Sequence, residues 1–539
     1  MEVFANTSPA TGAALDAVEA TPLDAIGEMA RKAQAAQVEW AALDVAKRVK
    51  TVAQLKGKLL ARAEEIATVV HEETGKPIVE ALLGEVLASA DVVGYWQEAI
   101  ADELLPFEAE IDALSYPSKS GWIHREARGV LGVIMPWNFP FALPLRTVVP
   151  ALMAGNAIVF KPSEVTPRTG KLIVDLLQGI VPEGVVQLVQ GGGDAGAKVA
   201  TDPNVDLVVF TGSPRSGRKV AHACADVLKP CVLELGGKDA AIVLADADLS
   251  RAANGIVWGA MMNAGQNCGA IERVYVETSV AQALTDAIVE ATKALRVGED
   301  LGGLTTEAQR TIVDEHVKAA RAAGGKVLVG GESCDLAGAK LGYRPTVISL
   351  ESDETPLVQD ETFGPVIPIM KVASADEAVQ RANASRYGLT ASVWTKDTKR
   401  GEALAKRLKA GVITINNHSF TGAIASAPWG GVGETGWGVT GSPLMLDHLT
   451  KPRFILVDKN RAAREVWWYP YTDTLKQLAL TFAALRGGAP LGARISAFFA
   501  LLLLLPRRMG ELKAGKPAAS KEGSKPSPPK SKATDEAAA

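Results

Sequence analysis

The amino-acid sequence predicts an α/β protein with a parallel sheet and more than one domain. Between residues 129 and 235, short apolar segments alternate with segments of helical periodicity, which is typical of strand–loop–helix units. The chain has 539 residues, more than a single hydrophobic core usually organises. Hydrophobic residues make up 47% and charged residues 22%, so the chain can bury a large core.

The elements are expected in a definite order along the chain. Residues from about 20 to 105 are rich in alanine and have the spacing of amphipathic helices. The alternating region should contain strands at Ser120–Arg125, Gly129–Met135, Ala157–Phe160, Val185–Val189 and Val205–Phe210, with helices that begin at Thr166 and Arg215. A second α/β region is expected from about residue 237 to 440.

The C-terminal part of the chain differs from the rest. Leu501 to Leu505 are consecutive leucines in an apolar segment that begins at Ile495, and this segment is shorter than the ~17–20 residues that span a bilayer. Basic and aromatic residues of the kind found at membrane interfaces surround it: Arg494, Arg507, Arg508, Trp467, Trp468, Tyr469 and Tyr471. Two interpretations stay open, peripheral membrane contact and a helix that packs in the core or between subunits. The tail after Gly510 is rich in Lys, Pro, Ser and Ala, which predicts disorder.

Charge and cysteine content exclude several classes of protein. A formal net charge of −4 is not typical of nucleic-acid binding. The four cysteines form no CxxC pair and the six histidines show no metal-ligand spacing, so neither a metal site nor a disulfide framework is expected. The first residues, MEVFANTSPATG, lack the basic and apolar regions of a signal peptide, and the default expectation is a cytoplasmic protein with reduced cysteines.

Two residues are candidates for covalent catalysis. Cys268 ends the segment NAGQNC, where small and amide residues favour a tight turn that a substrate can reach. A thiol is only slightly ionised at neutral pH, so a nucleophilic cysteine needs a base or a positive field nearby. Glu234 follows a predicted strand, Cys231–Leu235, and precedes two glycines, a position where α/β proteins usually form their sites. Taken alone, a cysteine is more often an inert core residue, and a glutamate is usually a solvated surface group.

Two glycine-rich segments are candidates for phosphate binding. The segment 191–196 (GGGDAG) matches GxGxxG literally, but no clear acidic partner follows about 20 residues later, so a simple strand–helix turn is the competing interpretation. The segment 210–217 (FTGSPRSG) is the better candidate. It follows an apolar strand and opens a helix, whose N-terminal N–H groups favour anions.

These segments and others resemble the aldehyde dehydrogenase superfamily over residues 5–458. The resemblance lies in separated motifs that occur in family order: ETGKP at 73–77, MPWNFP at 135–140, KPSE at 161–164, FTGSPRSG at 210–217, LELGGKD at 233–239, GQNC at 265–268, ETFGPV at 361–366 and PWGGVGETG at 428–436. The order and the Glu-to-Cys separation make the match specific.

The resemblance implies a catalytic role for three residues. Cys268 is expected to attack the aldehyde and form a thiohemiacetal. The Asn138 amide and the Cys268 backbone N–H would form the oxyanion hole. After hydride transfer, Glu234 would act as the general base that activates water to hydrolyse the thioester.

The resemblance also implies an NAD site. Lys161, Ser163 and Glu164 of KPSE resemble the ligands of the adenosine ribose, and segment 191–196 would lie near the adenine rather than the pyrophosphate. The other residues that resemble cofactor ligands are Trp137, Gly212, Ser213 and Gly217 near the pyrophosphate, with Glu361 and Phe363 near the nicotinamide ribose. A carboxylate at Glu164 favours the 2′-hydroxyl of NAD over a 2′-phosphate, although Lys161 could tolerate NADP.

The substrate is less well defined. Phe141, Leu145, Met261 and Met262 would form an apolar channel for medium-chain, long-chain or aromatic aldehydes. Arg146 offers an alternative, because semialdehyde dehydrogenases of this family place an arginine there for the distal carboxylate. Met262 stands where the enzymes of succinate semialdehyde have a second arginine, and Arg146 could equally pair with a structural acid.

Other functions are disfavoured by the same residues. A CoA-acylating relative would usually lack Glu234. A non-catalytic membrane-tethered scaffold would not need Asn138, Glu234 and Cys268, and a cysteine hydrolase would not need the ribose and phosphate segments.

The resemblance finally implies an architecture and a homodimer or homotetramer. A Rossmann-like cofactor domain, a catalytic α/β domain and a β-hairpin are expected, and the hairpin would pair across a dimer interface. The predicted bounds are 1–111 and 127–236 for the cofactor domain, 237–446 for the catalytic domain, 112–126 and 447–458 for the oligomerisation element, 459–510 for the apolar extension and 511–539 for the tail.

Overall fold

The computed structural model describes residues 3–113, 115–418, 420–488 and 490–513. The chain divides into two compact units. The first contains residues 3–108 and 122–455 and holds both large sheets. The second contains residues 109–121 and 456–513 of the described chain.

The first unit begins with a six-stranded sheet in the order β19-β9-β8-β5-β6-β7. All pairs are parallel except that of β19 with β9. The strands are β5 (Val130–Ile134), β6 (Ala157–Lys161), β7 (Val186–Leu188), β8 (Leu207–Thr211), β9 (Cys231–Glu234) and β19 (Gly436–Trp437). The chain runs from β5 outward to β7 and then returns to β8 on the other side of β5. The strand order therefore reverses between β5 and β8, and ligands of such sheets bind at the carboxyl ends of the strands at this point.

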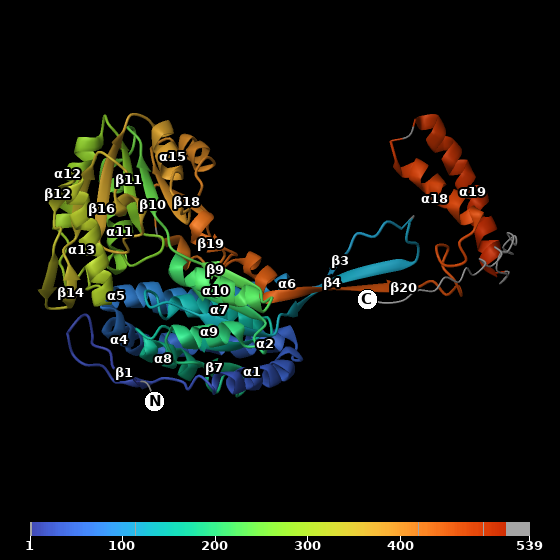
Figure 1. The fold of residues 1–539 in the computed structure, drawn as a ribbon, viewed down its shortest axis with the longest axis horizontal. Coiled ribbons are helices and arrows are strands. Elements are labelled where there is room, and N and C mark those ends of the chain that lie inside the picture. The colour runs from blue at the N-terminus through green and yellow to red at the C-terminus, as the bar shows by residue number, and fades with distance from the viewer. Residues whose placement is uncertain (1–2, 114, 419, 489, 514–539) are drawn as a thin grey trace, which may run out of the picture. The chain divides into compact units, whose positions relative to one another are not determined.

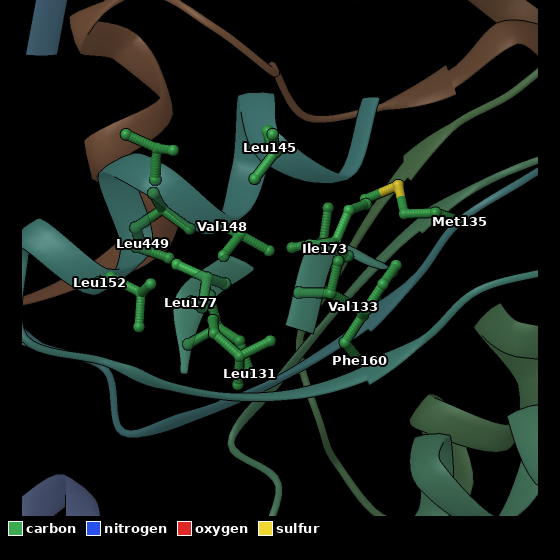
Figure 2. Packing of buried hydrophobic residues seen from close by; sticks show 14 of the residues in the cluster. Leu131, Val133, Met135, Leu145, Val148, Leu152, Phe160, Ile173, Leu177 and Leu449 are labelled. Carbon is green, nitrogen blue, oxygen red and sulfur yellow. The ribbon is translucent and has the colours of Figure 1, made fainter. Parts of the chain in front are cut away.

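Helices pack against this sheet, and the first hydrophobic core lies between them and the strands. They are α1 (Ile26–Ala41), α2 (Val45–Val52), α3 (Gln54–Ala61), α4 (Ala63–Thr74), α5 (Ile78–Ala81), the π-helix η1 (Leu82–Leu87), α6 (Ala88–Glu103), α7 (Ala142–Met153), α8 (Pro167–Leu177), α9 (Gly193–Thr201) and α10 (Pro214–Asp226). Figure 2 shows Leu145, Val148 and Leu152 of α7 packed among Leu131, Val133 and Phe160 of the sheet. The helices of this region and the alternating strands confirm the predicted order of elements.

A seven-stranded sheet forms the second core of the same unit, in the order β12-β15-β16-β11-β10-β17-β18. Only β12 is antiparallel to its neighbour. The strands are β10 (Asp239–Val243), β11 (Ile271–Glu277), β12 (Lys326–Val329), β15 (Thr346–Leu350), β16 (Val366–Val372), β17 (Thr390–Trp394) and β18 (Val412–Ile415). Their helices are α11 (Leu249–Met261), α12 (Ala281–Lys293), α13 (Glu307–Ala322), α14 (Pro356–Gln359), α15 (Ala375–Asn383) and α16 (Thr398–Ala405) (Figure 1). The predicted two-domain α/β fold is confirmed.

Short elements complete this unit. They are the pairs β1 (Val3–Phe4) with β2 (Val18–Glu19) and β13 (Ser333–Leu336) with β14 (Ala339–Tyr343), the 3-10 turns η2 (Met262–Gly265), η3 (Phe420–Ala423), η4 (Gly433–Thr435) and η5 (Pro443–Met445), and the helix α17 (Leu446–Leu449). After β18 the chain returns to the first sheet: β19 pairs with β9, and Met445, Leu446 and Leu449 are buried in the first core. The catalytic sheet thus ends well before the predicted boundary at residue 446.

The predicted oligomerisation element differs from the structure. A three-stranded sheet has the order β20-β4-β3, with β3 at Phe107–Glu108, β4 at Lys119–Ala127 and β20 at Thr450–Asp458. The segment near 447–458 was expected to pair with a second subunit, but β20 lies beside β4 of its own chain. Arg128 directs this pairing, because its side chain donates to the carbonyls of His448 and Thr450 at 2.5 and 2.8 Å. The homo-oligomeric state stays a prediction.

The second unit contains α18 (Asp473–Arg486) and α19 (Leu491–Lys513). Residues 511–513, assigned to the disordered tail, are the last residues of α19, and residues 514–539 lie outside the described residues. Along the described part of the chain, every helix is too short or too polar to cross a membrane.

Candidate active site

Two cavities of the first unit meet at Cys268. The larger has a volume of about 1070 Å³ and is lined by the carboxyl ends of β5, β6 and β8 and by residues of the catalytic domain. The smaller has a volume of about 290 Å³. Cys268 lines both. The sulfur atom can therefore be approached by one ligand from each side.

The loop that carries Cys268 is held in an unusual backbone conformation. Asn263, Ala264 and Gly265 all have positive φ, at 56°, 54° and 73°, and two of them are not glycine, which stores strain. Hydrogen bonds oppose this strain: Asn263 Nδ2 donates to the Gln266 carbonyl at 3.0 Å, and Gln266 Nε2 donates to the Asn263 carbonyl at 3.0 Å. A side chain at Gly265 would overlap the backbone of Gly364. The loop that carries Cys268 is thus held in place by contacts within the protein itself.

Asn138 lies beside this loop. Its side-chain Nδ2 donates to the backbone carbonyl of Gln266 at 3.2 Å, and the backbone carbonyl of Asn138 accepts from Asn263 Nδ2 at 2.9 Å. The same carbonyl accepts from Lys76 Nζ at 2.7 Å. Lys76 forms a fully buried ion pair with Glu85 at 2.6 Å. These contacts hold Asn138 against the loop that carries Cys268.

Glu85 connects this group to helix α7. Its Oε2 accepts from the backbone N–H groups of Phe141 and Ala142 at 3.1 and 2.7 Å, where a carboxylate also complements the positive end of the helix dipole. Lys76 lies in the motif ETGKP and Asn263 in the segment NAGQNC, but these patterns alone predict no role for either residue. Glu85 carries no signal in the sequence, since only the π-helix η1 brings it to Lys76.

Glu234 is the second group near the sulfur atom. It is 3% exposed, and its Oε1 accepts from the indole N–H of Trp429 at 2.9 Å. Burial raises the pKa of Glu234, and the Trp429 hydrogen bond opposes that rise. Burial, followed by the charge of Glu234, raises the pKa of Cys268 well above its ordinary value. One negative charge shared between these two groups is therefore favoured over two.

The larger cavity has the donors and acceptors that a dinucleotide needs. The predicted residues Trp137, Lys161, Ser163, Glu164, Gly212 and Ser213 all line it, together with Arg215 and Lys219. Ser213 caps α10 by accepting from Ser216 N–H at 3.3 Å, so the helix N-terminus opens toward the cavity. The cations and the helix N-terminus suit phosphates, and the carboxylate of Glu164 suits ribose hydroxyls. An NAD-type cofactor fits this donor set.

Gly217 does not belong to this group. It does not line either cavity, and a Cβ there would lie 2.9 Å or less from the methyl groups of Leu235. The position faces the sheet because it is three residues into α10, opposite the exposed Arg215 and Ser216 face. Its glycine is required for close packing of α10 against Leu235, the residue after β9, and a cofactor contact at this position stays a prediction.

Glu361 and Phe363 also line the larger cavity. Glu361 Oε1 accepts from Gly237 N–H at 3.0 Å, and burial raises the pKa of this carboxyl to about 8. Phe363 has a φ of 53° and packs edge-on against Trp137, with ring centroids 5.6 Å apart. Glu272 holds its backbone by accepting the N–H of Phe363 at 2.8 Å.

The smaller cavity is mostly apolar. Its walls include Leu83, Val92, Phe139, Leu143, Trp258 and Met262. Three of the residues predicted for this channel, Phe141, Leu145 and Met261, are instead buried in the two cores. For Leu145 the reason is its position around the axis of α7. Ala142, Leu143 and Arg146 lie on the side of α7 that faces the cavity, whereas Leu145 and Val148 face the sheet.

Arg146 and Glu80 are two of the ionisable residues that line this cavity. Arg146 donates to the carbonyls of Gly422 and Ala427, the second at 3.1 Å, so it pairs with backbone rather than with an acid. Burial lowers its pKa to about 10. Glu80 accepts from Asn263 N–H at 3.0 Å, and burial raises its pKa to about 7. Sequence analysis missed Glu80, which follows ETGKP by three residues.

Comparison with known proteins identifies the family. The family model described as "Aldehyde dehydrogenase family" matches residues 1–455. The chain belongs to the aldehyde dehydrogenase family. It is 35% identical to 4,4'-diapolycopene aldehyde oxidase of a Methylomonas species over 477 residues, which cover 88% of this chain and 89% of that protein. It is 33% identical to betaine aldehyde dehydrogenase 2 of Rhizobium meliloti (strain 1021) over 432 residues, which cover 79% of this chain and 88% of that protein.

A solved structure supports the cofactor. The NAD+ complex of an aldehyde dehydrogenase from Bacillus cereus matches with a TM-score of 0.81 and 31% identity, over 85% of this chain and 94% of that one. The family resemblance drawn from the motifs is confirmed. The enzyme is therefore an oxidoreductase of aldehydes that uses NAD(P).

Proposed function

We propose that this aldehyde dehydrogenase oxidises an apolar aldehyde, of medium or long chain or aromatic, to the carboxylic acid with NAD. The observation that carries the substrate class is the smaller cavity, where aliphatic and aromatic side chains surround the approach to Cys268. Apolar surface removed from water contributes about 0.8 kcal/mol for each CH₂ group. A longer alkyl chain should therefore bind better until the cavity is filled.

Catalysis begins with proton transfer from sulfur. Because Cys268 and Glu234 favour a single shared charge, movement of the thiol proton to the carboxylate places the charge on sulfur. The thiolate attacks the aldehyde carbon, a C–S bond forms, and the carbonyl π electrons move to oxygen. The Asn138 amide and the Cys268 backbone N–H donate to this oxygen.

Collapse of the thiohemiacetal completes the oxidation. NAD+, which Trp137, Ser213 and Glu361 would help to hold in the larger cavity, would accept the hydride that departs from the former aldehyde carbon together with the bonding electron pair. The carbon is then a thioester of Cys268. Once Glu234 has released its proton, it removes a proton from water, and the hydroxide attacks the thioester. The C–S bond breaks, the carboxylic acid is released as product, and the Cys268 thiolate is restored.

Glu164 supports NAD as the preferred cofactor. Its carboxylate lies at the larger cavity, 3.5 Å from Lys161 Nζ. A carboxylate accepts a hydrogen bond from the 2′-hydroxyl of NAD and repels the 2′-phosphate of NADP. The basic residues Arg215 and Lys219 nearby would reduce that repulsion, so the measured preference is expected to be moderate.

A semialdehyde is the second candidate, and Arg146 is its only support. The guanidinium lines the cavity, and no acceptor among the described residues bonds to its Nε. Two of its other N–H groups are engaged by Gly422 and Ala427, and the carboxylate of Glu80 in the same cavity would repel a substrate carboxylate. An uncharged aldehyde suits these surroundings better.

The test is NADH formation by purified enzyme with a series of aldehydes. Propanal, hexanal, decanal, benzaldehyde, betaine aldehyde and succinate semialdehyde would each be supplied with NAD and with NADP, beside Cys268→Ala. We expect kcat/KM to rise up to about fourfold for each CH₂ from propanal, and Cys268→Ala to be inactive. Equal kcat/KM from propanal to decanal would contradict an apolar pocket. A preference for succinate semialdehyde that Arg146→Lys removes would establish the second candidate, and folded, NAD-binding protein without turnover would favour the scaffold interpretation.

A further inference from the structure

The second unit ends in a pair of helices, α18 and α19, which we call the C-terminal hairpin. Figure 1 shows the two helices side by side. Their contact is narrow: Leu475, Leu478 and Leu501 are buried, with a few partly buried side chains around them. Buried Arg508 of α19 donates to the carbonyls of Val466 and Trp468 at 3.0 and 2.5 Å. This contact holds the aromatic segment 467–471 against the hairpin.

Helix α19 has a second apolar face that α18 does not cover. Its residues occupy one stripe, because they follow the i, i+4, i+7, i+8, i+11 spacing of a helix. They are Leu491, Ile495, Phe498, Phe499, Leu502, Leu503 and Met509, and their exposed fractions run from 46% for Met509 to 77% for Leu503. The stripe extends over about 27 Å of helix, at 1.5 Å per residue. A continuous exposed apolar surface of this kind indicates an interaction site.

The charge of this part of the chain selects the partner. Residues 459–539 contain 14 Lys and Arg against six Asp and Glu, a formal charge of +8, whereas the whole chain has −4, so residues 1–458 carry −12. Arg494 and Arg507 lie on opposite sides of the apolar stripe by helical spacing and are both exposed. Positive charge beside an apolar helix face favours an anionic lipid surface.

The aromatic residues agree with this assignment. Trp468, Tyr469 and Tyr471 are 57%, 71% and 71% exposed and lie in the segment that Arg508 fixes to α19. Tryptophan and tyrosine prefer the boundary between the headgroups and the acyl chains. A second copy of the hairpin is a poorer occupant of the stripe, because two segments of the same high positive charge repel each other.

We propose that the C-terminal hairpin binds the surface of an anionic lipid bilayer, with the exposed stripe of α19 inserted among the acyl chains. The helix would lie in the plane of the membrane, since the described helices are too short or too polar to span it. This inference does not depend on which aldehyde the enzyme oxidises. An apolar aldehyde also partitions into a bilayer, so such an anchor would hold the enzyme where that substrate collects.

The experiment is sedimentation of the full-length enzyme with vesicles. Vesicles of phosphatidylcholine alone and of phosphatidylcholine mixed with phosphatidylserine would be compared at low and high salt. The test variant is Phe499→Asp with Leu503→Asp, both on the stripe. The matched control is Val38→Asp with Leu228→Asp, exposed apolar residues of the first unit at 65% and 93%, which change the net charge equally.

We expect wild type and control to bind the phosphatidylserine vesicles, more weakly at high salt, and at least tenfold more weakly to phosphatidylcholine. The stripe variant should lose binding at least tenfold while it oxidises benzaldehyde or hexanal as wild type does. Absence of vesicle binding by the wild type, or equal binding by the two double variants, would overturn the proposal. A stripe variant that instead dissociates a lipid-free oligomer in analytical ultracentrifugation, with vesicle binding unchanged, would assign the stripe to a second copy of the chain.

Discussion

Trp429 donates its indole N–H to Oε1 of Glu234 over 2.9 Å. The tryptophan belongs to the segment that returns from the catalytic sheet to the first sheet, and it lines the smaller cavity. It therefore joins the proposed general base to the wall of the proposed aldehyde pocket. Because the hydrogen bond stabilises the charged carboxylate, it lowers the pKa of Glu234 against the effect of burial.

Trp429→Phe should move the pH dependence of turnover to higher pH. A hydrogen bond to a charged group contributes about 1.5–3 kcal/mol, so its loss should raise the pKa of Glu234 further. The measurement is kcat against pH where thioester hydrolysis limits the rate. Trp437→Phe is the control, because that indole is 54% exposed and donates to the Cys231 carbonyl instead. Superimposable profiles for wild type and Trp429→Phe would show that the hydrogen bond does not tune the base.

Glu234→Gln should separate the two halves of the reaction. Without the neighbouring charge, which is the second cause of the raised pKa of Cys268 after burial, the thiol should ionise at lower pH. Alkylation of Cys268 by iodoacetamide, followed by mass spectrometry against pH, should shift accordingly. Steady-state turnover should fall by roughly 10²–10⁴, while a single burst of NADH remains at a pH high enough to ionise the thiol without Glu234. Loss of the burst even at that pH would mean that Glu234 does more in thioester formation than accept the thiol proton.

The features that could be predicted from the sequence are those that depend on the pattern of neighbouring residues. The continuous apolar segments of β5, β6 and β8 predict buried parallel strands. The reversal of strand order between β5 and β8 places residues 135–138 and 211–213 at one cavity. Cys268 and Glu234 became specific candidates only through the order of the family motifs, since neither residue has a distinctive local context.

The sequence did not predict features that depend on the direction of a side chain or on contacts between segments that are far apart in the chain. Phe141 and Leu145 are apolar residues beside Asn138, but the phase of α7 turns them into the core. Gly217 lies in a phosphate-type motif but does not line the cavity, because the side chain of Leu235, the residue after β9, packs against it. Glu85 and Glu80 reach the site only because a π-helix and a strained loop bring distant segments together, and neither feature has a short-range signature.

The Lys76–Glu85 pair should contribute strongly to stability because both side chains are about fully buried, at 1% and 0% exposure. Lys76→Met leaves the Glu85 carboxylate without its counter-charge, and loss of one partner of a buried pair typically destabilises by about 3–5 kcal/mol. The exposed pair of Arg31 with Glu28, at 60% and 52% exposure, provides the contrast, since Arg31→Met should change stability by less than ~1 kcal/mol. Urea unfolding compares the two variants. Equal midpoints would mean that the donors at Phe141 and Ala142 suffice to stabilise the carboxylate.

Glu80 should make the folded enzyme less stable as pH rises. Burial raises its pKa from 4.5 to about 7, so between these values the folded state keeps a proton that the unfolded state has lost. Stability is then greatest below the unfolded pKa and falls as pH rises toward the folded pKa. The side chain of the Glu80→Gln variant cannot ionise, so the free energy of unfolding of this variant should exceed that of the wild type by on the order of 1–3 kcal/mol between about pH 5 and about pH 8.

Thermal unfolding of both proteins across this pH range is the measurement, and Glu64→Gln, at an exposed residue of α4, is the control. Glu361, whose pKa is raised to about 8, adds a slope of the same sign to every variant, so the difference between wild type and Glu80→Gln is the diagnostic quantity. Parallel curves would place the Glu80 carboxylate in contact with water in the free enzyme.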